Sequence, residues 1–349
     1  MTTFKALWVD KKANESIYSL SWIDRDVDAL PAGDVLVRVQ YSSLNFKDAL
    51  SAKGNRAVTH QYPHTPGIDA AGIVEQSGDN RFPPGTRVIV TGYDLGMNTP
   101  GGFGGYIRVP GDWVIPCPES LSLRDSMIFG TAGLTAALCV EKLLQMGLAP
   151  DQGDVVVSGA TGGVGSLSVA ILARLGFSVA ACTGKLERVD YLAGLGASKV
   201  IDRETIVDGS ERPLLPESWA GAIDTVGGDM LFSIIKSLKY GASVACCGLV
   251  SSPCFQATVF PFILRGVNLL GVDSVELPRE KKAAIWQLLA GSWQPDGLEK
   301  IATEVCLAEL PEYIETIFRG KLVGRVVVNL QERSAVENNP ADTIRSFGQ

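Results

Sequence analysis

The chain has 349 residues, which is more than one hydrophobic core usually supports, so we expect two domains. Its 46% hydrophobic and 20% charged residues are typical of a folded, soluble protein. We see no uninterrupted apolar run of membrane-spanning length and no secretory leader, so we expect a cytoplasmic protein without a membrane partner. The formal net charge of −7 argues against nucleic acid as a partner, because such surfaces neutralise phosphates with Lys and Arg.

Residues 1 to about 115 contain short β-like runs, such as Asp34–Ser42 and Thr86–Thr91. Gly and Pro residues separate these runs and mark turns between strands. No helix of ordinary length is evident in this part of the chain. The pattern predicts a compact, mostly antiparallel β domain.

The pattern changes near Asp125 to one of alternating helices and strands. Ser126–Met146 has helical composition, and Gly147 and Pro150 supply stop signals after it. This alternation predicts a doubly wound parallel sheet with helices on both faces, and therefore an α/β fold. The predicted strands are Asp154–Ser158, Ser178–Cys182, Ala222–Asp224, Ser243–Cys247 and Asn268–Val272, and the predicted helices between them include Gly165–Leu175 and Glu187–Leu195.

The strongest chemical signal is the glycine-rich stretch Ser158–Gly165, which directly follows a predicted strand and opens a predicted helix. Glycines there let the backbone approach a pyrophosphate, and the start of the helix offers unpaired N–H groups. Ala160 stands where the usual dinucleotide fingerprint has its first glycine, a position that alanine can occupy at negative φ. The alternative is an ordinary glycine-rich turn.

The end of the second predicted strand indicates which dinucleotide is preferred. NAD-binding chains usually carry an acidic residue there, to bind the ribose hydroxyls. This chain has Thr183, Gly184 and Lys185 instead, so donors and a positive charge are available for a 2′-phosphate, with Arg188 as a further candidate. We therefore predict NADPH as the cofactor; the alternative for Lys185 and Arg188 is a solvated helix start.

Several separated segments resemble the zinc-independent medium-chain reductases of the YhdH/YhfP group. That group includes acrylyl-CoA reductase and proteins labelled quinone oxidoreductase. The resemblance covers about residues 3 to 330 and is carried by Tyr41–Leu50, Pro66–Gly72, Gly130–Ala136, the Ser158–Gly165 turn, Ile223–Gly228 and Gly324–Asn329.

The resemblance implies a domain organisation. A GroES-like catalytic domain is expected from residues 1–125 and 264–330, and a Rossmann NADPH-binding domain from residues 126–263. The polar segment 331–349 predicts a flexible C-terminal extension. A homodimer is expected from the group, and an edge strand near Asn268–Val275 could pair across its two-fold axis.

No metal is predicted. Zinc-dependent relatives have a Cys where this chain has Asn45, and a His-Glu pair where it has Ile68 and Asp69. The region from Gly85 to Asp112 lacks the cysteines of a structural zinc site. The seven cysteines are scattered without a C-x-x-C pair and are predicted to be reduced core residues. His60 and His64 lie among prolines, which predicts loop histidines.

The resemblance also implies site residues. Tyr41, Asn45 and Asp48 are expected near the nicotinamide, with Asn45 as the best donor to the cofactor or acceptor and Asp48 orienting its neighbours. For Tyr41, a half-buried structural tyrosine is an equal alternative. Cofactor contacts are implied for Tyr41, for the turn residues Thr161, Gly162, Gly163 and Val164, for Thr183, Gly184 and Lys185, and for Arg203, Leu249 and Ser274.

The expected reaction is the transfer of hydride from NADPH to an activated alkene, most simply acrylyl-CoA to give propionyl-CoA. The phosphates of an acyl-CoA substrate would need cations, for which Lys53, Arg56, Arg279, Lys281 and Lys282 are candidates. Two alternatives stay open. One is a quinone or another enoyl compound as acceptor, and the other is an NADPH-binding protein without catalysis.

Overall fold

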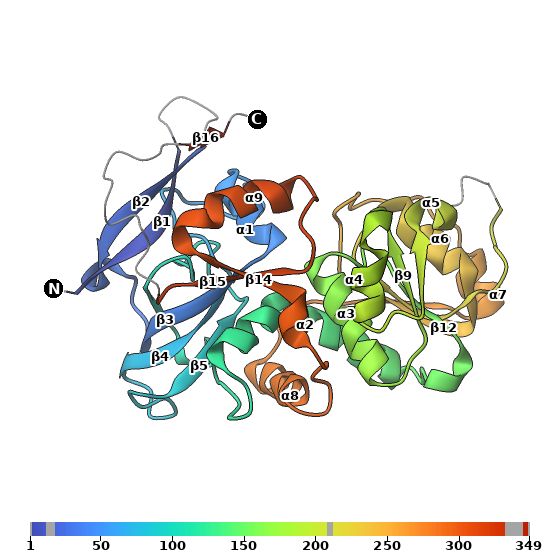
Figure 1. Cartoon of the computed structure of the whole chain (residues 1–349), viewed down its shortest axis with the longest axis horizontal. Coiled ribbons are helices and arrows are strands. Elements are labelled where there is room, and N and C mark those ends of the chain that lie inside the picture. Colours follow the sequence, from blue (N-terminus) through green and yellow to red (C-terminus); the bar gives the residue numbers. More distant parts are fainter. Residues whose placement is uncertain (1, 12–17, 208–211, 332–344, 348–349) are drawn as a thin grey trace. The chain divides into compact units, whose positions relative to one another are not determined.

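The computed structural model describes residues 2–11, 18–207, 212–331 and 345–347, and the chain divides into two compact units (Figure 1). Unit 1 comprises Met1–Thr131, Val275–Gln287 and Glu299–Gln349, and unit 2 comprises Ala132–Ser274 and Leu288–Leu298. The units divide at Thr131/Ala132 and Ser274/Val275, and the predicted domain division at 125/126 and 263/264 stays a prediction. Thr131 bonds to Asp69 within unit 1, and Ser274 bonds to Thr135 within unit 2.

Unit 1 contains a seven-stranded sheet with the order β14-β15-β3-β4-β5-β7, in which β6 also pairs with β3. Its pairs are antiparallel except β14 with β15, so the predicted mostly antiparallel β domain is confirmed. A second sheet has the order β1-β2-β16. The strands are β1 Thr3–Lys11, β2 Tyr18–Asp26, β3 Val35–Leu44, β4 Asp69–Ser77, β5 Arg87–Thr91, β6 Tyr106–Val109, β7 Val114–Pro116, β14 Ala302–Cys306, β15 Arg325–Asn329 and β16 Arg345–Phe347.

The helices of unit 1 include one that the sequence pattern did not predict. α1 covers only Phe46–Ala52, and it packs against α9. The other helical elements of unit 1 are α9 Leu310–Phe318, most of α8 Arg279–Leu289, the start of α2 Leu123–Gln145, and the short 3-10 turns Val27–Ala29, Gly111–Trp113 and Leu307–Glu309, with most of a fourth at Leu298–Ile301.

Only part of the predicted C-terminal extension is described. Arg345–Phe347 form strand β16, which pairs antiparallel with β2 at Tyr18–Leu20. This segment therefore adds a strand to the β1–β2 ribbon, where the sequence predicted a flexible end. Residues 332–344 and 348–349 lie outside the described part of the chain.

Unit 2 is built on a six-stranded parallel sheet with the order β10-β9-β8-β11-β12-β13, which confirms the predicted doubly wound fold. The strand order reverses between β8 and β11, and ligands of such folds bind outside the carboxyl ends of the strands at this point. The strands are β8 Val155–Val157, β9 Val179–Thr183, β10 Lys199–Asp202, β11 Trp219–Asp224, β12 Leu238–Cys246 and β13 Asn268–Gly271. The helical elements are α3 Gly163–Arg174, α4 Val189–Gly194, α5 Arg203–Ile206, α6 Gly228–Ser237, α7 Phe260–Arg265, the larger part of α2, and the 3-10 turns Pro150–Gln152 and Leu186–Arg188.

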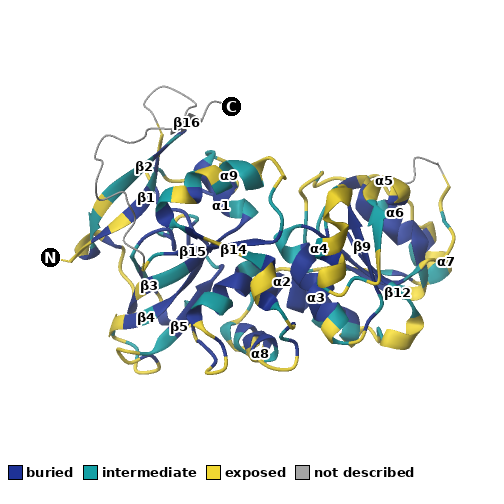
Figure 2. Cartoon of the chain, viewed as in Figure 1, coloured by how far each residue is buried: buried dark blue, intermediate teal, exposed yellow. Residues whose placement is uncertain are grey.

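Burial explains why the strands of unit 2 read as continuous apolar runs. All residues of β8 and β9 are buried, because helices cover both faces of the sheet (Figure 2). Cys182 lies in this core, and Cys117 and Cys139 are also buried, as predicted for reduced core cysteines. Cys254 departs from that prediction because its side chain is exposed.

Helix α2, Leu123–Gln145, is long and apolar enough by length and composition to span a membrane, although the sequence pattern suggested that no such run exists. Within its most apolar 18-residue stretch, 78% of the residues are buried inside the protein, as in the core helix of a globular domain. The helix is also interrupted at Gly130, whose φ of 51° and ψ of −152° are not helical.

Candidate functional site

The glycine-rich turn after β8 has the close packing that a phosphate-binding turn requires. Gly159 has a φ of +59°, which favours glycine. A Cβ on Gly165 would lie 2.2 Å from the Gly159 carbonyl oxygen, so no side chain fits there. Ala160 avoids positive φ, and its methyl group is fully buried while its N–H donates to the Cys182 carbonyl at 3.0 Å. Alanine is therefore compatible with this turn.

The turn leads directly into α3, whose first residues offer N–H groups to a ligand. Gly162 is the N-cap of this twelve-residue helix and makes no side-chain cap hydrogen bond. The first N–H groups of a helix have no partner within the helix, and they carry its positive dipole end. Gly162, Gly163 and Val164 are partly accessible. The Gly162 N–H already donates to the Gly159 carbonyl at 2.9 Å, so the predicted N–H donors to an anionic group such as a pyrophosphate are those of Gly163 and Val164.

The predicted 2′-phosphate residues gather at the end of β9. Thr161 and Thr183 are both buried, and their hydroxyl oxygens lie 3.3 Å apart, which joins this corner to the glycine-rich turn. The Thr183 hydroxyl also accepts the Lys185 N–H at 3.0 Å. A Cβ on Gly184 would lie 2.8 Å from Arg203 Nε, so the Arg203 side chain lies against this glycine.

The charge at this corner is suited to an anion. Burial lowers the pKa of the Lys185 ammonium, with Glu187 opposing this shift and Arg188 adding to it. Asp202, which ends the neighbouring strand β10, caps α5 by accepting the Glu204 N–H at 3.0 Å. Lys185 and Arg203 thus bring two cations to one corner of the sheet.

Leu249 and Ser274 lie farther along the sheet than the other predicted cofactor contacts. Leu249 follows β12 and is 59% exposed. Ser274 follows β13 and is buried, and its hydroxyl shares a hydrogen bond of 2.7 Å with the Thr135 hydroxyl. Their role as cofactor contacts stays a prediction.

In unit 1, Asn45 is fully engaged by neighbouring side chains and backbone. It is 8% exposed and precedes α1 as its N-cap. Its Nδ2 donates to Asp69 Oδ2 at 2.7 Å and to the Ser43 carbonyl at 3.2 Å, and its Oδ1 accepts from Arg325 Nη1 at 3.1 Å. An amide has two N–H groups, so both are used. The predicted role of Asn45 as a donor to the cofactor or acceptor stays a prediction.

Asp48 is fully buried and fastens α1 to the Gly67–Ile68 loop. Its carboxylate accepts three backbone N–H groups, from Asn45 at 2.8 Å, Gly67 at 3.2 Å and Ile68 at 2.9 Å. Burial raises the pKa of Asp48 to about 7, the nearby Asp69 charge adds to the rise, and the three N–H donors oppose it. These contacts fit the orienting role expected for Asp48.

Asp69 and Arg325 form the centre of the unit 1 network, and sequence reasoning assigned them no role. Their side chains are 0% and 3% exposed, and Arg325 Nη2 lies 3.8 Å from Asp69 Oδ2. Asp69 also accepts from the hydroxyls of Ser43 and Thr131, each at 2.6 Å. Arg325 additionally donates to the Ser43 hydroxyl and to two backbone carbonyls. A charged residue directly before the apolar run Val326–Val328 was the available signal.

Gly130 is needed where α2 passes this network. A Cβ there would lie 2.4 Å from Asp69 Oδ2 and 2.6 Å from Ser43 Oγ. The interruption of α2 at Gly130 also directs the Thr131 N–H to both Asp69 oxygens at 3.0 Å. The helix break therefore serves the buried carboxylate.

The residues of unit 1 do not fit a zinc ion. Asp69 is saturated by hydrogen bonds and an arginine, and Asn45 and Ile68 are not zinc ligands. Within the described part of the chain, no three His, Cys, Asp or Glu side chains are placed to hold a metal. His64 is buried in a loop with Nε2 2.9 Å from the Gly96 carbonyl oxygen, and burial lowers its pKa to about 4. His60 is exposed.

Tyr41 differs from Asn45 and Asp48 in the hydrogen bonding of its polar group within the described residues. It lies in β3 opposite Ala71 and Asn329 and is half-buried. Among the residues that the structure describes, its hydroxyl has no hydrogen-bond partner. Its role stays a prediction.

Most of the cations suggested for an acyl-CoA are already engaged. Lys53 pairs with Glu315, Arg279 pairs with Glu280 at 2.9 Å, and Arg56 donates to the His60 carbonyl. Lys282 is fully buried and donates to the carbonyls of Thr91 and Val275. A free cation for the CoA phosphates is therefore not provided by Lys282.

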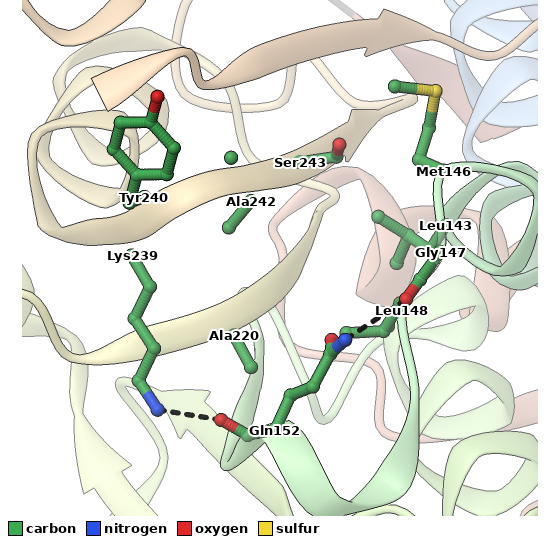
Figure 3. A pocket seen from close by; sticks show the side chains of 11 residues that line it. Leu143, Met146, Gly147, Leu148, Gln152, Ala220, Lys239, Tyr240, Ala242 and Ser243 are labelled. Atoms are coloured by element: carbon green, nitrogen blue, oxygen red, sulfur yellow. Dashed lines mark hydrogen bonds between the residues drawn. The ribbon is translucent and has the colours of Figure 1, made fainter. Parts of the chain in front are cut away.

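A pocket of about 370 Å³ lies near the amino ends of β11 and β12 in unit 2 (Figure 3). It is lined by the end of α2 and the starts of β11 and β12, and Lys239 Nζ donates to the Gln152 carbonyl at 2.7 Å beside it. None of the predicted site residues lines this pocket. The candidate cofactor residues lie instead at the carboxyl ends of the strands.

Two family models match the chain. The alcohol dehydrogenase GroES-like domain matches residues 31–119, and the zinc-binding dehydrogenase family matches residues 163–291. The second name refers to a metal that the donor groups described above do not fit.

Individual relatives match nearly the whole chain. Acrylyl-CoA reductase AcuI of Ruegeria pomeroyi is 45% identical over 332 residues, covering 94% of this chain and 99% of that protein. YhfP of Bacillus subtilis is 46% identical with the same coverage, and its name places it with the quinone oxidoreductases. The structure of YhfP with NAD bound has a TM-score of 0.91 over 95% of this chain and all of that one. The YhdH oxidoreductase of Salmonella enterica in complex with NADP is 42% identical, with a TM-score of 0.90 over 93% of this chain and 99% of that one. This chain therefore belongs to the zinc-independent medium-chain dehydrogenase/reductase family, in its quinone oxidoreductase-like group with YhdH, YhfP and AcuI.

Proposed function

We propose that this protein is an NADPH-dependent oxidoreductase that reduces an activated carbon–carbon double bond, with acrylyl-CoA as substrate and propionyl-CoA as product. The observation that carries the proposal is the corner at the end of β9, where Thr183, Lys185 and Arg203 gather without an acidic residue at the strand end. It occurs in a chain 45% identical to an acrylyl-CoA reductase.

The cofactor residues have distinct tasks in this proposal. The N–H groups of Gly163 and Val164 bind the pyrophosphate at the start of α3, while Gly162 holds the turn through its N–H bond to the Gly159 carbonyl. Lys185 and Arg203 bind the 2′-phosphate through charge-assisted hydrogen bonds, with the Thr183 hydroxyl holding the Lys185 backbone in place. Leu249 and Ser274, which follow later strands, contact the nicotinamide half.

NADPH supplies the hydride when it is bound. The residues of unit 1 then position the acceptor and stabilise the charge that develops on it. Tyr41 is the candidate donor, because its hydroxyl has no partner among the described residues. Asn45 and Asp48 hold the segment that follows Tyr41 in one conformation, since both side chains are fully engaged there.

A quinone is the second candidate acceptor, favoured by the 46% identity to YhfP. The test is loss of absorbance at 340 nm when NADPH is mixed, in separate cuvettes, with acrylyl-CoA, crotonyl-CoA or a benzoquinone. Rapid turnover with acrylyl-CoA is expected. Turnover with the quinone alone would select the second candidate, and cofactor binding without any turnover would identify a binding protein.

We further propose that the protein acts in the cytoplasm as a homodimer, without nucleic acid or membrane as a partner. β13 is an edge strand of the unit 2 sheet, and Leu269 in it is 40% exposed. Val259, Ile263 and Leu264, in and beside α7, are also exposed. Pairing of two β13 edges would cover such apolar groups. Sedimentation analysis should give twice the chain mass, and Leu269→Lys should yield monomers.

A further inference from the structure

The segment that joins β11 to α6 in unit 2 has no assigned role, and its side chains contact the glycine-rich turn. This loop comprises Asp224–Gly228, from the last residue of β11 to the first of α6, and it begins beside the end of β8 because Ile223 pairs with Val157 in the sheet. This is the point at which the strand order reverses. The loop therefore starts next to the glycine-rich turn.

Two side chains of the loop hold the first residue of that turn. The Ser158 hydroxyl donates to Asp224 Oδ1 at 2.7 Å and accepts the Thr225 N–H at 3.0 Å. The Thr225 hydroxyl donates to the Ser158 carbonyl at 2.9 Å. Ser158 thus has both its hydroxyl and its carbonyl fastened to the loop.

The Thr225 hydroxyl also occupies the space beside Gly159. A Cβ on Gly159 would lie 2.4 Å from Thr225 Oγ1. Gly159 has a φ of +59°, and its carbonyl approaches Gly165 at the start of α3. The hydroxyl therefore packs against the residue that bends the chain toward the helix N-terminus.

The same loop holds the segment that contains Leu249. The Asp224 carbonyl accepts the Cys247 N–H at 3.0 Å, and the Val226 carbonyl accepts the Ser251 N–H at 2.9 Å. A Cβ on Gly248 would lie 1.9 Å from the Thr225 carbonyl oxygen, so the two backbones are in direct contact. The loop therefore links the turn after β8 to the segment after β12.

The Asp224 carboxylate is occupied on both oxygens. It is fully buried, and Oδ2 accepts the Gly227 N–H at 2.8 Å while Oδ1 is bonded to Ser158. Burial raises its pKa, and the hydrogen bonds from Ser158 and from the backbone at Gly227 and Val226 oppose the rise. A carboxylate that accepts side-chain and backbone donors on both oxygens in this way orients its neighbours.

We infer that Asp224 and Thr225 are positioning residues, which set the glycine-rich turn and the Leu249 segment in the one arrangement that accepts a dinucleotide. The inference rests on the proposed function, because it requires that NADPH binds at the carboxyl ends of these strands. Neither residue is placed in contact with the cofactor; both act through Ser158, Gly159 and Gly248.

The test uses the full-length protein with Thr225→Val, which keeps the side-chain shape and removes the hydroxyl. The NADPH dissociation constant, measured by fluorescence, should rise roughly tenfold. The reason is that the hydrogen bond to the buried Ser158 carbonyl is lost, and one hydrogen bond changes an equilibrium constant by about a factor of ten. Thr225→Ser restores the hydroxyl and should stay within about twofold of the original protein. The matched control is Thr86→Val in unit 1. It removes the Thr86 hydroxyl, which donates to the Pro83 carbonyl at 2.6 Å.

Two readouts separate positioning from a general loss of structure. In Thr225→Val the KM for NADPH should rise while kcat at saturating NADPH and the KM for the acceptor stay unchanged. Without cofactor, hydrogen exchange of the Ser158–Gly165 amides should become faster in Thr225→Val than in Thr86→Val. Asp224→Asn should weaken NADPH binding in the same way, and Thr225→Val keeps the test valid if Asp224→Asn does not fold.

The outcomes distinguish this inference from the function on which it rests. Thr225→Val with the NADPH affinity of the original protein would overturn the positioning role and leave the proposed function intact. Equal weakening by Thr225→Ser and Thr225→Val would also overturn it, because the hydroxyl would then be irrelevant. Failure of the original protein to bind NADPH at all would overturn both.

Discussion

The polar residues of the two units are arranged in opposite ways. In unit 1, Asn45, Asp69 and Arg325 are buried and bonded to one another. At the carboxyl edge of unit 2, the glycine-rich turn presents backbone N–H groups, and Lys185 and Arg203 remain accessible. Buried side chains that bond to one another hold the structure in place, whereas accessible cations and helix N–H groups can contact a ligand. Our proposal accordingly divides the predicted site residues into those that position and those that bind.

The largest effect is expected from Arg325→Met in the unit 1 network. Removing the guanidinium leaves Asp69, Ser43 and two backbone carbonyls without their partner in the protein interior. Breaking a buried ion pair in this way costs about 3–5 kcal/mol of unfolding free energy. The measurement is urea unfolding, with Arg319→Met as a control because that side chain is mostly exposed. If Arg325→Met lowers the free energy of unfolding no more than Arg319→Met does, the network contributes no stability.

A second test uses pH to probe a buried group of unit 1. Burial lowers the pKa of His64 to about 4, below its unfolded value of about 6.5, so protonation favours the unfolded chain. The contribution of neutral His64 to the free energy of unfolding is complete above about pH 6.5. It is lost as the pH falls toward 4, and the loss amounts to at most about 3 kcal/mol. His64→Gln should lose less stability than the original protein over this range.

The control for that experiment is His60→Gln, at the exposed histidine of the same loop region. Urea midpoints of the three proteins are compared at several pH values between 7.5 and 4.5. If His64→Gln and the original protein lose stability in parallel, His64 is not the group responsible.

In unit 2, at the predicted cofactor site, Lys185→Ala should raise the KM for NADPH about tenfold or more and leave the KM for NADH nearly unchanged. The reason is that a charge-assisted hydrogen bond to the 2′-phosphate is lost only with NADPH. Lys239→Ala is the matched control, since that lysine lies near the amino end of β12, whereas Lys185 follows the carboxyl end of β9. Equal effects on both cofactors would remove the 2′-phosphate assignment.

The smallest effect is expected from Tyr41→Phe, which sharpens the division within unit 1. If the hydroxyl donates to the acceptor or cofactor, its loss should lower kcat/KM by about fivefold to tenfold without changing the urea midpoint. Tyr106→Phe, in a strand that also pairs with β3, is the control. A decrease of the urea midpoint with unchanged kinetics would place Tyr41 with the structural residues.

Local sequence patterns predicted the parts of the fold that depend on neighbours in the chain. The apolar run ending at Ser158 and the glycines after it predicted β8, the turn and α3 within about two residues of their observed ends. These elements follow from continuous burial and from the backbone freedom of glycine. The short helix α1 was missed, although Asn45 followed by Asp48 forms a capping box that could have indicated it.

The network of unit 1 could not be predicted in the same way. Asp69 and Arg325 lie in different strands, and Thr131 reaches them only because α2 breaks at Gly130. No pattern within a single segment shows that a charge on one strand faces a charge on another. The sequence therefore indicated the segments of the candidate site, while the hydrogen bonds that occupy the Asn45 side chain could be seen only in the three-dimensional contacts.

The position of Arg325 in β15, late in the chain, has a consequence for biosynthesis. Asp69 leaves the ribosome about 250 residues before Arg325 does, which is an interval of roughly 10 to 50 seconds at ordinary rates of translation. During that time the carboxylate lacks its cation, and β3 lacks its neighbour β15. A nascent chain arrested before residue 325 should therefore remain sensitive to protease throughout its N-terminal part, even though most of that part has already been made.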